Sequence, residues 1–67
     1  MWLKPLNQAC GTQACPRLFV TDHDTIVVQG TLLSAELAGV STDVGEALVE
    51  VPRSVVLEAL QRLASGA

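Results

Sequence analysis

The side chains best suited to chemistry are two cysteines and the single histidine, all in the first third of the chain. Cys10 and Cys15 form a C-x4-C pair, and His23 follows between Asp22 and Asp24. Two thiolates, one imidazole and one carboxylate make a donor set that tetrahedral zinc accepts. However, the four-residue spacing is wider than that of a tight zinc knuckle, and the chain has no second cysteine pair. We therefore weigh a small zinc-stabilised module against plainer interpretations of these residues.

The two cysteines have two other interpretations, a local disulfide and a pair of reduced thiols. A disulfide across this short loop is geometrically allowed. The N-terminal residues lack an apolar stretch long enough for a signal peptide or a membrane span, which favours a cytoplasmic protein. Cytosolic thiols stay mostly reduced, so we expect Cys10 and Cys15 to be reduced, with one or both packed as small apolar side chains. We expect no cofactor, and Cys10, Cys15 and His23 remain the alternative zinc ligands.

The same residues also make a weak case for catalysis. A cysteine nucleophile with His23 as its base needs a third group that orients the imidazole, and an oxyanion site. Asp22 and Asp24 flank the histidine, but aspartates are also ordinary turn residues. A chain of 67 residues has little room for a ligand-sized pocket, and its five glycines form no phosphate-binding loop. We expect the protein not to be an enzyme.

The histidine lies in the turn of a predicted β-hairpin at 17–30. Residues 18–21 and 25–29 are rich in the β-branched and aromatic types that fit a pleated surface. The three residues between them, with two turn-forming aspartates, complete a hairpin pattern. Neither strand has a cleanly polar second face, so we expect both faces of the hairpin to be at least partly covered.

Three more elements follow the hairpin. Residues 34–40 predict one or two turns of helix, with Ser34 as the N-cap and Gly39 at the C-terminus. Residues 46–51 alternate between apolar and polar side chains, which predicts a third strand that ends at Pro52.

The clearest helix is predicted at 53–64. Four apolar residues at helical spacing form its stripe: Val56, Ala59, Leu60 and Leu63. Residues 1–16 have no periodicity and predict an irregular or extended arm. The fold class is therefore α+β, with a single small domain at 17–67 that combines a three-stranded antiparallel sheet and a C-terminal amphipathic helix.

Composition suggests a protein partner. Hydrophobic residues make up 49% of the chain, yet it has one Trp, one Phe and no Tyr, so the core must be aliphatic. A chain of this size hides only about 60% of its unfolded surface, and small folds often gain stability by oligomerisation. We expect a homodimer. The residues on faces that a small core leaves uncovered are our interface candidates: Trp2, Leu3, Phe19, Val27 and Val55.

Charge argues against nucleic acid as the direct ligand. The net charge is −3, and the chain has only four fixed cations. Direct nucleic-acid binding normally needs a basic patch that neutralises phosphates. We therefore expect no direct nucleic-acid contact and no membrane contact.

Three segments carry a resemblance to a known family. They are CPRLFVTD from Cys15, TIVVQG from Thr25 and GEALVEVP from Gly45, followed by the amphipathic helix. The pattern, over 15–63, resembles short actinobacterial proteins related to the bald-locus B developmental regulator, which are encoded beside helix-turn-helix transcription factors. Asp24 stands where that pattern has a turn glycine. The resemblance implies a small dimeric, non-enzymatic protein in transcriptional or developmental control, with a helix-turn-helix regulator as a partner, and it assigns no binding residue.

A second likeness points elsewhere. The segments 37–40, 44–46 and 49–52 are similar to swapped-hairpin dimers of the transition-state-regulator type. That likeness implies a dimer that binds DNA directly. The acidic balance and the missing basic arm count against it, so it stays the alternative.

Overall fold

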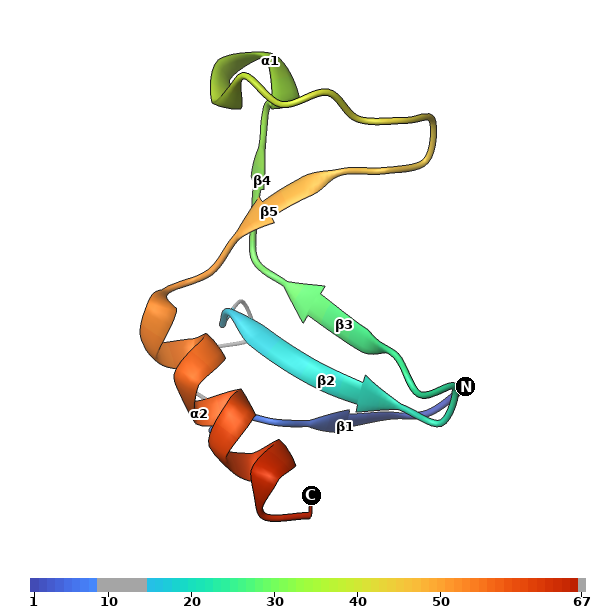
Figure 1. The fold of residues 1–67 in the computed structure, drawn as a ribbon, viewed down its shortest axis with the longest axis vertical. Helices are drawn as coiled ribbons and strands as arrows, with labels where there is room; N and C mark the ends of the chain where they lie inside the picture. Colours follow the sequence, from blue (N-terminus) through green and yellow to red (C-terminus); the bar gives the residue numbers. More distant parts are fainter. Residues whose placement is uncertain (9–14, 67) are drawn as a thin grey trace.

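The computed structural model describes residues 1–8 and 15–66 (Figure 1). Its elements are β1 (Leu3–Pro5), β2 (Arg17–Thr21), β3 (Ile26–Gln29), β4 (Thr31–Leu33), α1 (Ala35–Ala38), β5 (Leu48–Glu50) and α2 (Arg53–Ala64). Strands β1, β2 and β3 form an antiparallel sheet in that order, and β4 and β5 form a separate antiparallel pair. The predicted α+β class, with a three-stranded antiparallel sheet and a C-terminal helix, is confirmed.

The predicted hairpin is β2 and β3, and its turn is organised by the buried Thr21. The Thr21 hydroxyl oxygen accepts hydrogen bonds from the backbone N–H groups of His23, at 3.0 Å, and Thr25, at 3.3 Å. It also shares a 2.6 Å hydrogen bond with the Thr25 hydroxyl. Asp24 adopts φ +61°, a left-handed conformation that glycine adopts most readily. The missing turn glycine is therefore a real cost at this position, partly relieved because aspartate tolerates this region better than most residues.

The N-terminal arm is more regular than the sequence predicts. Its first part is β1, which pairs with β2 with Leu3 opposite Thr21 and Pro5 opposite Phe19. Leu6 continues the pairing through a 2.8 Å hydrogen bond from its N–H to the Leu18 carbonyl, and its side chain is fully buried. The arm therefore supplies the third strand of the main sheet and a core residue, which corrects the predicted boundary of the domain at residue 17.

Asn7 explains how the arm is held after β1 ends. Its side chain is buried, and its Oδ1 accepts a hydrogen bond of 2.8 Å from the Leu18 N–H. Its Nδ2 donates to the Pro16 carbonyl at 3.1 Å. One amide side chain thus satisfies a backbone donor and a backbone acceptor at the start of β2, groups that would be costly to leave unpaired.

The predicted third strand forms, but in a different sheet. β5 covers only Leu48–Glu50 and pairs with β4, with Thr31 opposite Glu50. The cause lies at Gly30, where the chain leaves β3. A Cβ at Gly30 would overlap the Glu50 carbonyl oxygen and lie 2.7 Å from Cγ1 of Val51. The return strand therefore crosses directly over Gly30, and β4, not the hairpin, is its neighbour.

Both predicted helices form. Helix α1 begins after Ser34, whose hydroxyl accepts from the Leu37 N–H at 3.5 Å, and it ends at Gly39 with φ +69°. Helix α2 packs against β2 and buries Ala59, while Val55 is half-buried. The Gln8 N–H also donates to Oε2 of Glu58 at 2.6 Å, which joins the arm to α2.

The predicted apolar stripe of α2 needs one correction. Leu60 was expected to face the core, but its side chain is 56% exposed, and the neighbouring Leu57 is 53% exposed. The buried side of the helix is centred on Ala59 instead. Leu60 lies about 100° round the helix from Ala59, since successive residues are separated by that angle. The predicted stripe of four residues was therefore wider than the side of the helix that the small sheet covers.

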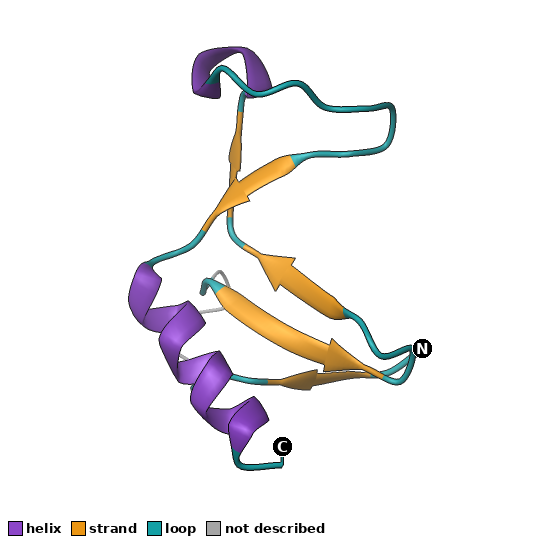
Figure 2. Ribbon diagram, viewed as in Figure 1, coloured by secondary structure: helices purple, strands orange, loops and turns teal. Residues whose placement is uncertain are grey.

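The molecule therefore has two regions (Figures 1 and 2). We call the part formed by β1, β2, β3 and α2 the body, and residues 31–50 the projecting unit. The projecting unit carries β4, α1 and β5 away from the body, and α1 lies at the far end of the molecule from the C-terminus (Figure 1). The radius of gyration is 13.1 Å, against roughly 11 Å for a rounded domain of this length. The chain is elongated because these 20 residues leave the body.

Candidate functional site

Of the three alternative zinc ligands, the structure describes Cys15 and His23. Cys15 is buried, and it is disulfide-bonded rather than reduced. Cys10, the only other cysteine of the sequence, lies outside the described residues. The prediction of reduced thiols was wrong for Cys15 because it rested on the assumed compartment and not on local geometry. A disulfide sulfur is neither a thiolate ligand nor a nucleophile, so Cys15 in this state supports neither zinc binding nor cysteine catalysis.

The third candidate ligand is His23. It occupies the β2–β3 turn, its side chain is 60% exposed, and its Nε2 is 3.8 Å from Oδ1 of Asp22. The same Asp22 oxygen accepts a 3.3 Å hydrogen bond from the Trp2 N–H, which ties the start of the chain to the turn. Within residues 1–8 and 15–66, no group of three or more His, Cys, Asp or Glu side chains could hold a metal ion. The acidic residues around His23 are explained by the turn.

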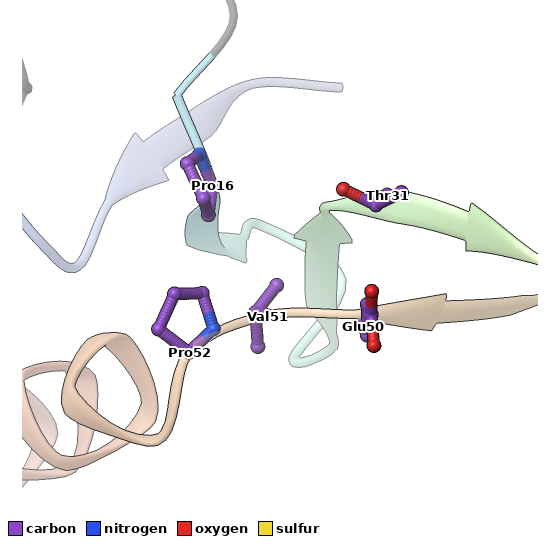
Figure 3. A pocket seen from close by; sticks show the side chains of 5 residues that line it. All are labelled: Pro16, Thr31, Glu50, Val51 and Pro52. Atoms are coloured by element: carbon purple, nitrogen blue, oxygen red, sulfur yellow. The ribbon is translucent and has the colours of Figure 1, made fainter.

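A cleft lies where the body meets the projecting unit (Figure 3). Its volume is about 350 Å³. Its lining is Pro16, Thr31, Glu50, Val51 and Pro52. Val51 projects into the space between the two prolines and the Thr31–Glu50 pair (Figure 3). Among the described residues of this lining, Glu50 is the only ionisable group and has no histidine, lysine or cysteine beside it, so this part of the cleft suits an apolar side chain better than an acid–base reaction.

The most unusual surface is the projecting unit. None of its side chains is buried, and only Ala35 and Leu48 are even partly covered. Leu37 is 91% exposed. The other large apolar side chains exposed on the unit are Leu32, Leu33, Val40, Val44 and Val49. Several large apolar side chains exposed on one segment typically mark a protein interaction site.

The unit also cannot account for its own stability. A two-stranded hairpin is at best marginally stable in water, and β4 and β5 each contribute three residues. Helix α1 has four residues, far below the length at which a helix is stable alone. Both strands leave an unpaired edge within the described chain. A further surface that covers the unit would supply the missing stabilisation.

The five predicted interface residues fall into two groups. Trp2 and Leu3 are exposed, whereas Phe19, Val27 and Val55 are half-buried. The strand register places Phe19 opposite Val27, and the same sheet face carries Leu3. The structure therefore brings three of them together on one face of the body sheet, with Val55 on α2.

The sequence reasoning missed the projecting unit itself. The sequence patterns predict a third strand and a short helix here, both within a single domain. The signal that could have found it is in the charges: residues 31–50 contain four acids, no cation and ten apolar residues. Such a segment, with charges of one sign and with helices and strands too short to be stable alone, is a candidate for binding to another protein surface.

Comparison of the chain with protein-family models, curated proteins and solved structures found no match. Among the described residues, neither helix has the length and apolar character needed to cross a bilayer.

Proposed function

We propose that this chain is a non-enzymatic protein-interaction module that acts as a homodimer in bacterial transcriptional or developmental regulation. The observation that carries the proposal is the projecting unit, a segment with no buried side chain and six exposed large apolar residues, made of elements that are too short to be stable alone. Segments of this kind become stable when a partner covers them.

The exposed area supports the same conclusion. The chain has an accessible surface of 5150 Å², whereas a folded monomer of its mass is expected to expose about 4,000 Å². The excess of roughly 1,100 Å² is somewhat more than the ~800 Å² that each partner buries in a standard protein interface. A single dimer contact would therefore bring the exposed area to an ordinary value.

The regulatory role rests on the resemblance to the bald-locus B group of actinobacterial proteins. Its motifs correspond to the β2–β3 hairpin and to the segment that runs through β5 into α2. In that family setting the natural partner is a helix-turn-helix regulator. The negative net charge, −3, supports contact with a regulator protein rather than with DNA.

A cytoplasmic location is part of the proposal. Disulfides in that compartment are typically transient or redox-sensing, so the bond at Cys15 would respond to the thiol pool there. The denatured mass of the protein purified from its own cytoplasm under thiol-trapping conditions tests this. Alkylation of Cys15 is the expected result, and a bond that is fully retained in that compartment would argue for an oxidising location.

Native mass spectrometry of the purified chain tests the interaction module. We expect a dimer with no added mass. A bound zinc ion that chelators remove would instead favour the zinc-stabilised module. A chain that remains monomeric at millimolar concentration would remove the homodimer from the proposal.

The regulatory part needs a DNA-binding assay. Helix-turn-helix regulators from the same genome are purified singly, and their affinity for operator DNA is measured with and without this chain. We expect the chain alone to leave nonspecific duplex unshifted at low salt and to change the affinity of one regulator. A salt-dependent shift by the chain alone would favour the alternative, a direct DNA-binding dimer.

A further inference from the structure

The two regions of the chain carry opposite charge. Four of the seven acids lie in the projecting unit: Glu36, Asp43, Glu46 and Glu50. All four fixed cations lie in the body: Lys4, Arg17, Arg53 and Arg62. The unit has a net charge of −4, while the rest of the chain has a net charge of +1. An acidic apolar unit is complementary to a basic apolar surface, and the body offers one.

That surface is the outer side of α2. Arg53, Leu57 and Leu60 are spaced by four and three residues, so they share one side of the helix. Leu57 and Leu60 are 53% and 56% exposed, and Arg53 is also exposed. No described residue forms a salt bridge with Arg53, whereas Arg62 on another side is paired with Glu58 at 3.3 Å. The outer side of α2 thus has two uncovered leucines and a cation without a described counter-ion.

We propose that the projecting unit of one copy docks on the outer side of α2 in a second copy, and that the two chains exchange their units in this way. The inference rests on the proposed homodimer and specifies its geometry. In such a dimer each acidic unit covers the Arg53–Leu57–Leu60 surface of its partner, so the contact occurs twice, as a two-fold arrangement requires. The excess exposed area of each chain, roughly 1,100 Å², is large enough for the ~800 Å² that one partner buries in a standard interface.

The charges also decide against the simplest alternative. Two projecting units could pair edge to edge and form a four-stranded sheet from two β4–β5 pairs. That arrangement would bring two segments of net charge −4 together, without a cation in either. Like charges brought together across an interface are strongly unfavourable. Docking on α2 replaces that repulsion with attraction.

A charge-reversal experiment in the full chain tests the exchange. The first variant carries Glu36→Arg and Glu50→Arg in the projecting unit, and the second carries Arg53→Glu in α2. We expect each variant alone to dimerise at least about tenfold more weakly, since both contacts then juxtapose like charges. An equimolar mixture is expected to restore wild-type affinity as a heterodimer, because both contacts are then between opposite charges. Native mass spectrometry distinguishes the heterodimer from either homodimer by mass.

A pair of apolar variants locates the contact independently of charge. Leu57→Gln with Leu60→Gln changes two exposed side chains, so circular dichroism should be unchanged while dimerisation weakens. Ile26→Gln with Val28→Gln is the matched control, since these β3 side chains are also apolar and exposed. The control is expected to leave the dimer intact.

Three results would overturn the inference. If the wild type dimerises but neither the charge variants nor the α2 variant weakens it, the contact lies elsewhere while the proposed function stands. If Lys4→Glu weakens the dimer as much as Arg53→Glu, the attraction is general and α2 is not the docking surface. If the wild type is monomeric at millimolar concentration, self-docking is excluded, and the regulator assay alone then decides the proposed function.

Discussion

The body and the projecting unit differ in how they satisfy their apolar and polar groups. The body contains the buried residues of the described chain, which are Leu6, Asn7, Cys15, Thr21 and Ala59. The projecting unit contains no buried residue, although it has a two-stranded sheet and a capped helix. Regular secondary structure by itself therefore does not make a core. What separates the two regions is a second layer, since α2 packs on β2 in the body, whereas the described residues bury no side chain of the projecting unit.

One substitution in each region gives the strongest test of whether the body is packed and the projecting unit is not. Leu6→Ala should lower the free energy of unfolding by about 3 kcal/mol, because it leaves a cavity in the body. Leu37→Ala, at a 91% exposed side chain, should change it by less than about 0.5 kcal/mol. Urea unfolding of both variants at one protein concentration, below that needed for dimers, measures the difference. Equal losses would mean that the unit is packed in the monomer.

The junction of the two regions is the next test. Gly30→Ala should destabilise the chain by about 2 kcal/mol, because the new methyl group meets backbone and the crossing strand must shift. Gly45→Ala is the comparison variant, since nothing lies within 4 Å of its Cβ and its only cost is the strain of alanine at φ +87°, with no clash against another strand. The loss at Gly30 should be accompanied by altered backbone amide shifts at 50 and 51. A tolerated Gly30→Ala would contradict the crossing.

The buried side chain of Asn7 is a further feature of the body that the projecting unit lacks. Asn7→Ala should cost about 2 kcal/mol, because the Leu18 N–H and the Pro16 carbonyl lose their partner in a buried place. Gln8→Ala is the neighbouring control, because Gln8 uses only its backbone in the hydrogen bonds of the described chain. Thermal unfolding of the two variants compares them. If both lose the same amount, the Asn7 amide does not hold the arm.

The smallest expected effect is an increase in stability from a substitution in the body. Asp24→Gly should stabilise the chain by about 0.5–1 kcal/mol, because φ is +61° there and glycine adopts that conformation without a Cβ clash. Asp22→Gly, a position with no positive φ and with a hydrogen bond to Trp2, should not stabilise it. Urea midpoints of the two variants give the comparison. A loss at Asp24 would show that its side chain contributes more than its backbone conformation costs.

Local structure was predictable because it depends on neighbours in the sequence. The 17–30 hairpin, the caps at Ser34 and Gly39, and α2 from Arg53 to Ala64 all follow from residue types within a few positions. The α+β class followed from their order. The interface candidates were less predictable, because the exposure of a side chain depends on residues far away in the sequence. Six of the 14 large apolar side chains that are exposed in the described chain lie in the projecting unit, which contains none of the five candidates.

Tertiary structure decided which strands pair and which faces are covered. Residues 46–51 have a strand pattern that fits either the hairpin or β4, and in the structure they pair with β4 and pass close to Gly30, where only a glycine leaves room. The arm looked irregular because three strand residues and one asparagine amide have no periodicity to detect, yet they complete the sheet. The residue pattern of a strand predicts which side chains share a face, but it does not predict which strand it pairs with. Whether those side chains are buried depends on that partner and on what packs against the face. The sequence by itself thus determined the hairpin, the strand before Pro52 and both helices, because their patterns are local. The strands β1 and β4, and the division into a covered body and an uncovered acidic unit, were decided by tertiary contacts between distant residues.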